Sequence, residues 1–454
     1  MKPHIAFQLG HDSCLSIYRP KQDDFIHVEL ERVTGRKHLN VAAHIMSKKD
    51  DNARLKKLLT TAFSKLESQY GIKPDFASCS VDISVNIPPS ERKALHEAVQ
   101  GMVECDEFFR ETVKHHDGHI YCGYAQSPFE DAVVLSWDGI GMNEFTVLSE
   151  VRQGVQVYRD DIRIAYGLMY NALGRTCHSL RNTKDNLDIA GKLMGLSVYG
   201  KPRKDMQADL EHLEETSSIY GTFSRYYYSR ILDGMRRFDK RAVIDVKRPW
   251  EMSELYAATH DEEKHRWRKH FLKDGIEKDV AYLGQKFIED GLIKIVEQNW
   301  YRIKSCGYIF VIAGGVSLNR LANSALKEKY PELNIYVPSN GADCGLSLGF
   351  LAKRMYDLGL ADYKKSYDVT YKGLSMLDRP NRSGVEVTVD EVVDLLKNKK
   401  IIGLIQGTGE NGPRALGNRS IICSAGHGMK DIINSKVKNR EHFRPFAPIC
   451  TVEN

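Results

Sequence analysis

The chain has 454 residues, of which 42% are hydrophobic and 28% are charged, with a formal net charge of +5. This composition excludes global disorder, and the charge is too small to indicate a nucleic-acid binder. No apolar run reaches the roughly 18 residues of a membrane span, and the scattered cysteines form no CxxC pair. The first residues lack the long apolar stretch of a secretory signal, so we expect a cytoplasmic protein.

Short apolar runs that end at Gly, Asp or Asn predict buried strands that enter turns. Five such runs occur, at residues 4–9, 132–137, 308–313, 334–337 and 401–406. Helical periodicity lies between them, for example over 283–300 and 392–397. Strands that alternate with helices predict an α/β fold.

The composition also predicts how the chain is divided. We expect a first domain over 1–362, with a mostly helical, Tyr-rich and charged insertion over about 201–275. That insertion is either a solvated helical subdomain or a cover over an acceptor site. The polar, turn-rich residues 363–388 are expected to be a linker, and a further unit is expected over 389–454. No internal sequence repeat is visible.

Two histidines form the first candidate for a functional site. His115 and His119 in the segment KHHDGH are four residues apart, so on a helix they share one face and can bind one metal ion. The alternative is a pair of surface histidines, and Gly118 between them weakens the prediction of a regular helix.

Two aspartates follow predicted strands. Asp138 lies in SWDGIG and Asp343 lies in SNGADCG, where α/β proteins place ligand chemistry. Each could instead cap a turn. Together with the two histidines they make a mixed nitrogen and oxygen ligand set, which suits Fe(II), Mn(II) or Zn(II).

Glycines and cations indicate phosphate binding. Gly314 and Gly315 in AGGVSLNRLAN lie between a predicted strand and a predicted helix, where backbone N–H groups can approach a nucleotide. The C-terminal segments NGPRALGNRS and VKNREHFRPFAP bring several cations close to turn residues, which suits phosphate binding by arginine. A solvated basic face is the simpler alternative, although Pro413, Gly417 and Pro445 disfavour a plain amphipathic helix.

These motifs together resemble one family. HHDGH, SWDGIG, KLMGLSVYGKP, AGGVSLNRLAN, SNGADCG, NGPRALGNRS and VKNREHFRPFAP occur in the order seen in O-carbamoyltransferases of the NodU/TobZ type. The resemblance covers essentially the whole chain. It implies a duplicated actin-like, sugar-kinase-like N-terminal domain and a YrdC-like α/β C-terminal domain. Members of this family usually continue well beyond FRPFAP, so the C-terminal domain is expected to be incomplete.

The resemblance implies an ATP-dependent O-carbamoyltransferase. The C-terminal unit would form carbamoyl-adenylate from carbamoyl phosphate and ATP, with Mg²⁺ accompanying the ATP. The N-terminal domain would then transfer the carbamoyl group to a hydroxyl of a small-molecule acceptor. Family positions for carbamoyl phosphate match Arg414, Lys438 and Arg444. Family metal ligands, usually on iron, match the four residues His115, His119, Asp138 and Asp343.

The first predicted strand ends at residues that match the family's HxDS-like segment. An acceptor hydroxyl has a pKa far above 7 and needs a general base, so we predict His11 as the base and Asp12 as the residue that orients it or the acceptor. The alternative is that His11 only caps the turn. Residues expected to line the adenylate are Gly10, Gly139, Gly314 and Gly315, with Asn319 at the ribose or base.

Several alternatives remain open from sequence. Lys192 and Lys201 either contact phosphates or lie on the surface. Rival functions are threonylcarbamoyl transfer to tRNA, a small-molecule kinase on the same fold, and a non-enzymatic, nucleotide-binding actin-like protein. The acceptor could be a sugar, an antibiotic, a nucleotide or another hydroxylated metabolite, and homodimerisation is left open.

Overall fold

The computed structural model describes residues 1–44, 51–83, 87–110, 113–141, 144–180, 183, 186–202, 276–375, 385–447 and 449. The predicted insertion over 201–275 lies outside these residues, apart from its first two positions. Within the described ranges, no helix is long and apolar enough to cross a membrane.

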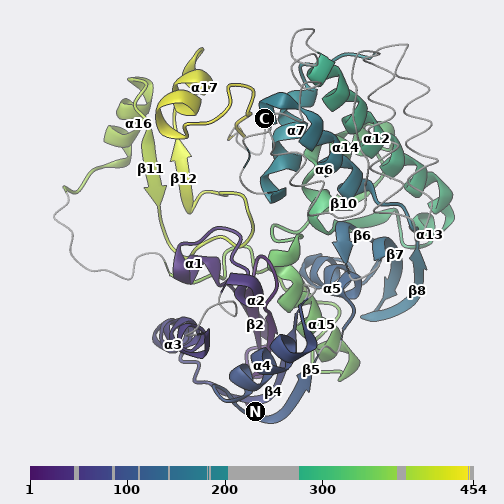
Figure 1. Ribbon diagram of the computed structural model, residues 1–454, viewed down its shortest axis with the longest axis vertical. Helices are drawn as coiled ribbons and strands as arrows, with labels where there is room; N and C mark the ends of the chain where they lie inside the picture. The colour runs from purple at the N-terminus through teal and green to yellow at the C-terminus, as the bar shows by residue number, and fades with distance from the viewer. Residues whose placement is uncertain are drawn as a thin grey trace.

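The first sheet is built from the N-terminal part of the chain (Figure 1). Its strands are β1 (His4–Gln8), β2 (Cys14–Arg19), β3 (Asp24–Glu29), β4 (Asp75–Asp82) and β5 (Glu104–Arg110). Their order is β3-β2-β1-β4-β5, with β2 antiparallel to both β1 and β3 and with β4 parallel to β1 and β5. Apolar residues of β1, β2 and β3, such as Ile5, Ile17 and Ile26, form one buried core with helices α3 (Asp51–Tyr70) and α4 (Pro89–Gln100).

The second sheet repeats this arrangement. Its strands are β6 (Asp131–Gly141), β7 (Glu144–Arg152), β8 (Val155–Asp161), β9 (Ile309–Ala313) and β10 (Asn334–Tyr336). They are ordered β8-β7-β6-β9-β10, again with an antiparallel triplet followed by two parallel strands. Gln153 and Gly154 both have positive φ and close the tight β7–β8 hairpin.

Helices fill the layers around the two sheets. They are α1 (Glu31–Thr34), α2 (Val41–His44), α3 (Asp51–Tyr70), α4 (Pro89–Gln100), α5 (His115–Gln126), α6 (Tyr166–Thr176), α7 (Ile189–Ser197), α12 (Ile276–Gln298), α13 (Trp300–Ser305), α14 (Arg320–Lys329) and α15 (Leu346–Asp357). Identical strand order in two consecutive sheets confirms the predicted duplicated, actin-like fold, although no sequence repeat announced it.

Each half of the duplicated domain ends in a helix that packs on the sheet of the other half. Helix α5 follows β5 but packs on β6 and β9, whereas α15 follows β10 but packs on β1 and β2. The two helices contact each other between the sheets. A Cβ added to Gly349 would collide with the backbone of Gly118, and one added to Gly118 would collide with Phe350. Gly118 therefore does not interrupt α5; it permits the close approach of α15.

The C-terminal unit is small and carries little buried apolar surface among its described residues. It contains α16 (Val389–Lys397), β11 (Ile402–Ile405), β12 (Arg419–Ile422), α17 (Met429–Ile432) and a π-helical turn (Ile433–Val437). Strands β11 and β12 pair in an antiparallel sheet. Helix α16 begins with a capping box between Thr388 and Glu391, yet none of its residues is buried.

Candidate metal centre and its surroundings

The structure brings four predicted ligands together. One nitrogen from each of His115 and His119 and one oxygen from each of Asp138 and Asp343 all lie within 4.8 Å of one another. The Nε2 atoms of the two histidines are 3.1 Å apart. His115 Nε2 lies 3.2 Å from Asp138 Oδ2, and His119 Nε2 lies 3.4 Å from Asp343 Oδ1. All four residues are buried.

The fold explains why these residues meet. The two histidines occupy the first two turns of α5, and Asp138 lies in β6 close to its end. Asp343 begins the short 3₁₀ helix Asp343–Gly345 that leads into α15. Because α5 and α15 approach so closely at Gly118 and Gly349, the two histidines at the start of α5 lie beside Asp343, which just precedes α15. Both groups lie next to Asp138, near the end of β6.

This donor set fits a borderline divalent metal ion. The two imidazole nitrogens lie 3.1 Å apart, which is close enough for both to bind one ion, and the two carboxylates would balance the positive charge of that ion. Burial opposes the charged form of His119, but Asp138 and Asp343 outweigh it and raise the His119 pKa to about 9. Two nitrogens and two carboxylate oxygens match the preferences of Fe(II), Mn(II) or Zn(II) better than those of a thiolate-seeking ion.

The predicted base and its partner adjoin this cluster. His11 Nε2 lies 3.0 Å from Asp343 Oδ2, and His11 Nδ1 lies 3.2 Å from Asp12 Oδ2. The negative charge of Asp343 is the largest cause that raises the pKa of His11, to about 10, against the opposing effect of burial. With both ring nitrogens directed at carboxylates and its pKa raised, His11 is held protonated in this arrangement, so it must lose a proton before it can act as a base.

A second histidine, which the sequence analysis did not identify, binds the same aspartate. His38 Nδ1 lies 2.7 Å from Asp12 Oδ1, and its side chain is 17% exposed. The hydrogen bonds from the two histidines outweigh burial and lower the pKa of Asp12. His38 follows Arg36 and Lys37 in a polar loop, so no periodicity or motif distinguished it before the fold was known.

The predicted nucleotide cradle surrounds Asp138. The backbone N–H of Gly315 donates to Asp138 Oδ1 at 2.8 Å, and Gly314 has φ +90° with its Cα against the backbone of Trp137. A Cβ placed on Gly139 would meet no atom within 4 Å. These contacts show why glycine is needed at 314, and they leave nucleotide binding as a prediction.

Two other residues of the predicted adenylate site have places in the structure. Gly10 is buried, and its carbonyl accepts a hydrogen bond from Ser13 Oγ. Asn319 caps α14 through Ala322 and exchanges two hydrogen bonds with the side chain of Gln285. The amide of Asn319 is thus occupied within the protein in this arrangement.

The segment GPRALGNRS forms a loop held by buried carboxylates. Glu410 Oε1 accepts the backbone N–H groups of Leu416, Asn418 and Arg419, and Glu410 Oε2 pairs with Arg419 Nε at 2.9 Å. Glu29 at the end of β3 accepts the N–H of Gly412. The loop is therefore fixed both internally and to the first sheet.

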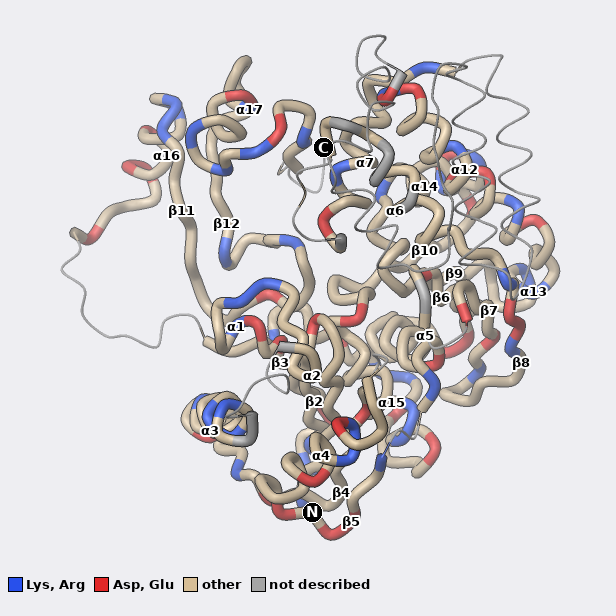
Figure 2. Tube along the Cα trace, in the orientation of Figure 1, with Lys and Arg blue, Asp and Glu red and all other residues tan. Residues whose placement is uncertain are grey.

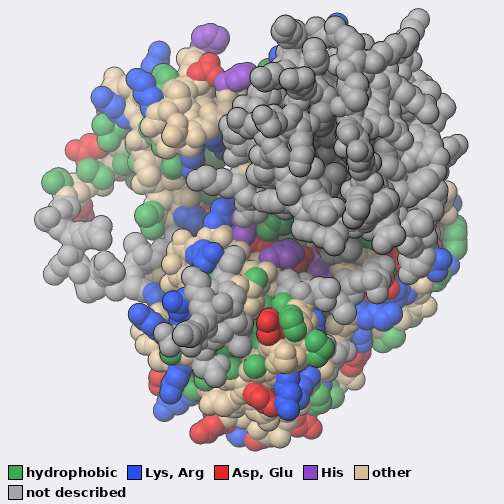
Figure 3. All heavy atoms as spheres, viewed as in Figure 1, with side chains coloured by type: hydrophobic (Ala, Val, Ile, Leu, Met, Phe, Trp, Pro, Cys, Tyr) green, Lys and Arg blue, Asp and Glu red, His purple; other side chains and the backbone are tan. Residues whose placement is uncertain are grey.

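The predicted carbamoyl phosphate residues lie on and near this loop. Arg414 and Lys438 are exposed, while Arg444 is partly buried. Desolvation first, and then the positive charges of Arg444 and Arg320, lower the pKa of Arg414. Arg320, which begins α14, was not predicted. Figure 2 shows Lys and Arg on both sides of β12, and Figure 3 shows histidine side chains near the middle of the same face with cations beside them.

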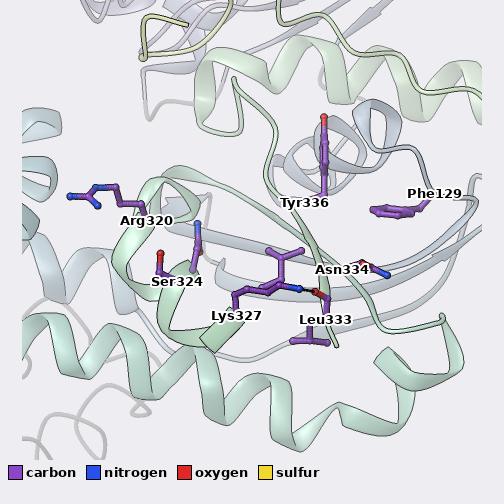
Figure 4. A pocket seen from close by; sticks show the side chains of 9 residues that line it. Phe129, Arg320, Ser324, Lys327, Leu333, Asn334 and Tyr336 are labelled. Carbon is purple, nitrogen blue, oxygen red and sulfur yellow. Dashed lines mark hydrogen bonds between the residues drawn. The ribbon is translucent and has the colours of Figure 1, made fainter. Parts of the chain in front are cut away.

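A cavity of about 480 Å³ lies elsewhere, between α14 and the edge strand β10 (Figure 4). Its lining includes Phe129, Arg320, Lys327 and Tyr336 but none of the predicted site residues. Lys327 Nζ donates to the carbonyls of Pro331 and Leu333, each at 2.7 Å. The cavity is therefore separate from the candidate metal centre.

Fold and site together define a class, namely an actin-like protein with a buried His₂Asp₂ cluster between its two halves. The family model for the carbamoyltransferase N-terminus matches residues 82–351, and the one for the carbamoyltransferase C-terminus matches residues 393–454. The chain belongs to the carbamoyltransferase family of the NodU/TobZ type, as its motifs predicted.

Individual relatives agree with this assignment. The 3'-hydroxymethylcephem-O-carbamoyltransferase of Streptomyces clavuligerus is 26% identical over 99% of this chain and 78% of its own length. Nodulation protein U of Rhizobium tropici is 29% identical over 74% of this chain. The chain spans only 56% of that relative's length. Among solved structures, HypF of T. kodakarensis aligns with a TM-score of 0.39 and 11% identity, covering 81% of this chain and 50% of HypF.

Proposed function

We propose that this chain is an ATP-dependent O-carbamoyltransferase that forms carbamoyl-adenylate and passes its carbamoyl group to a hydroxyl of a small molecule. The observation that carries the proposal is the buried His₂Asp₂ cluster with His11 and Asp12 at its edge, in a chain that also holds the ordered arginine loop. A kinase or a passive nucleotide-binding protein gives no reason for two buried histidines and two buried aspartates to converge.

In the first step, carbamoyl phosphate loses inorganic phosphate to water, and the resulting carbamate attacks the α-phosphorus of ATP. The C–O–P bond of carbamoyl-adenylate forms as the bond to pyrophosphate breaks. Arg414, Arg444 and Lys438 would bind the phosphoryl oxygens, since the buried Glu410 fixes the loop that presents Arg414. Mg²⁺ would accompany the ATP.

In the second step, the acceptor oxygen attacks the carbamoyl carbon and AMP leaves. His11 would take the hydroxyl proton, and Asp12 would hold the imidazole through its 3.2 Å contact with Nδ1. The ion held by His115, His119, Asp138 and Asp343 would supply Lewis acidity toward the adenylate. The absence of a side chain at Gly139 would let the AMP phosphate come close to the backbone there.

Product analysis tests the overall reaction. The protein would be incubated with Fe(II), Mg²⁺, ATP and carbamoyl phosphate, and the nucleotides and phosphates would be identified by mass spectrometry. We expect carbamoyl-adenylate or AMP, with pyrophosphate, and only when carbamoyl phosphate is present. ADP as the product would replace this proposal by a kinase, and the absence of any turnover would contradict it.

Metal content tests the cluster without an activity assay. We expect purified protein reconstituted with Fe(II) to retain about one ion per chain, and His119→Ala to lose it. His116→Gln is the matched control, because His116 is equally buried in α5 but bonds Ser136 instead of pointing at the cluster. Equal metal retention by wild type and His119→Ala would remove the ion from the proposal.

The base is tested separately. His11→Asn removes the proton acceptor but keeps a side chain that can bond Asp12, so pyrophosphate release should continue while transfer to the acceptor slows by about 10²–10⁴-fold. A His11→Asn enzyme that transfers at the full rate would show that His11 only caps the turn.

A further inference from the structure

Helix α7 touches both reaction regions, although no functional residue was assigned to it. Asp188, the residue before its first turn, and Lys192 lie four positions apart. Their side chains pair with different parts of the chain: Asp188 with the loop after α1, and Lys192 with the segment after α17.

The contact of Lys192 is short and well shielded. Lys192 Nζ lies 2.6 Å from Glu441 Oε1 and 2.9 Å from Thr183 Oγ1, with side-chain exposures of 14% for Lys192 and 24% for Glu441. The other carboxylate oxygen of Glu441 faces Arg444 at 4.0 Å. Lys192 is therefore not a free cation for phosphate, and Glu441 joins it to a predicted phosphate-binding arginine.

Apolar packing fixes the same junction. Phe443, between Glu441 and Arg444, is 4% exposed and belongs to the same core as Leu193 and Met194 of α7. A Cβ on Gly195 would lie 3.3 Å from Pro445 and 3.4 Å from the carbonyl of Phe443. The segment that carries Arg444 thus rests directly on α7.

Asp188 makes the corresponding link on the other side. Asp188 Oδ1 accepts from Lys37 Nζ at 2.5 Å and lies 3.9 Å from His38 Nε2. His38 in turn binds Asp12, which binds His11. Asp12 and His38 both have left-handed φ, 53° and 52°, a conformation that is uncommon for residues other than glycine.

We propose that α7 carries two positioning residues, Lys192 acting on Arg444 through Glu441 and Asp188 acting on Asp12 through His38, so that one helix aligns the carbamoyl phosphate site with the transfer site. The inference rests on the function proposed above for these two sites. It assigns Glu441 and His38 as the intermediates, and it explains why an acidic residue stands next to cations that bind phosphate.

Charge exchange tests the first link. Lys192→Glu and Glu441→Lys should each raise the KM for carbamoyl phosphate in pyrophosphate release by about tenfold, with kcat changed by less than about threefold. The double variant should restore the KM to within about threefold of wild type. The control exchange is Lys329→Glu with Glu297→Lys, an exposed pair of nearly equal length, at 2.7 Å, which should leave the KM unchanged. Single variants with a normal KM, or a double variant no better than the singles, would overturn the assignment.

Binding of inorganic phosphate, followed by calorimetry, separates this idea from the proposed reaction. The Kd for phosphate should weaken in each single variant and recover in the double, whether or not the chain turns over. If wild type releases no pyrophosphate but phosphate binding follows this pattern, the reaction is wrong and the positioning by Lys192 stands. If the Kd for phosphate is the same in wild type and in the Lys192 and Glu441 variants, the proposed positioning by Lys192 is wrong.

The second link has its own signature. Asp188→Asn should leave the KM for carbamoyl phosphate unchanged but slow AMP release, so that carbamoyl-adenylate accumulates, and Asp188→Glu should recover most of the rate. A purely structural role would lower the unfolding temperature and both steps alike. Normal AMP release by Asp188→Asn would overturn this half of the proposal.

Discussion

The two halves of the N-terminal domain share one topology but contact their crossing helices through different chemistry. Helix α15 meets the first sheet through a polar chain, in which Ser347 Oγ lies 2.9 Å from Ser16 Oγ and Ser16 Oγ lies 2.8 Å from His27 Nδ1. Helix α5 meets the second sheet through a polar contact near its start, His116 Nδ1 to Ser136 Oγ at 2.7 Å, and through apolar contacts further along, with Gly123 against Val311 and Val134. The two halves thus have the same strand order, but the side chains at their helix–sheet interfaces differ.

The same comparison explains the site. Equivalent places in the two halves are the end of the first strand and the start of the crossing helix. The first half offers His11 at the end of β1 and the histidine pair at the start of α5. The second half offers Asp138 near the end of β6 and Asp343 just before α15. The histidines of the first half lie beside Asp138 and Asp343 of the second half because α5 and α15 each pack on the sheet of the other half.

The largest effect should come from the point where the crossing helices touch. Gly349→Ala places a methyl group against the backbone of Gly118, which cannot rotate away, so we expect a loss of more than about 3 kcal/mol in the free energy of unfolding. Metal retention should fall with it, since α15 carries Asp343. Urea denaturation and metal analysis would measure both.

A helical glycine with free space provides the control. No atom lies within 4 Å of a Cβ placed on Gly191 of α7, so Gly191→Ala should gain about 0.5–1 kcal/mol from lower chain entropy. If the two alanine variants behaved alike, the close contact of α5 and α15 would not be what aligns the two halves.

The second effect tests, by pH, the polar chain between α15 and the first sheet. Burial lowers the pKa of His27 from 6.5 to about 4, so below pH 6.5 the unfolded chain binds a proton that the folded chain refuses. Stability is therefore lost as the pH falls from 6.5 to 4, by up to about 3 kcal/mol from this residue. His27→Gln should flatten that part of the stability curve. Parallel curves for wild type and variant would show that His27 does not titrate this way.

The sequence predicted strands where an apolar run is uninterrupted, and it predicted site residues where they lie in a short motif. The strands β1, β6, β9, β10 and β11 were predicted, and so were the four residues that the cluster contains, but the predicted burial was wrong for β10 and β11, whose residues are exposed or only partly buried. Strands such as β2, β3 and β4 were not, because buried polar residues, among them Ser16, His27 and Ser80, interrupt their apolar pattern. Strand β5 is mostly exposed and has no apolar run to detect.

The missed site residues share a different cause. His38, Asp188 and Glu441 pair with residues far away in the chain, and Glu410 accepts backbone N–H groups of its own loop. Neither kind of contact produces a regular spacing of residues in the sequence, so the periodicity could not indicate it. Only the folded arrangement shows that KLMGLS and NREHFRPF, two motifs of the resemblance, pack against each other.

A third, smaller effect tests the apolar part of the α5 interface. A Cβ on Gly123 would lie 2.8 Å from Val311 Cγ1, which can move by side-chain rotation, and 3.3 Å from Ala313 Cβ, which moves only with its backbone. Gly123→Ala should therefore cost only about 1–2 kcal/mol, and adding Val311→Ala should recover part of it. Chemical denaturation of the single and double variants would show this, and a loss that Val311→Ala leaves unrelieved would place the obstruction elsewhere.

The smallest effect tests whether the polar chain stabilises the first interface at all. Ser347→Ala removes the hydrogen bonds to Ser16 Oγ and to Cys14 Sγ, but Ser16 keeps its bond to His27, so no donor is stranded. The cost should be about 1 kcal/mol, and it should be the same at pH 5 and pH 8, because Ser347 does not touch the titrating ring. A pH-dependent cost would mean that the hydrogen-bonded chain from His27 to α15 responds to protonation as one unit, which would couple the first sheet to the helix that follows Asp343.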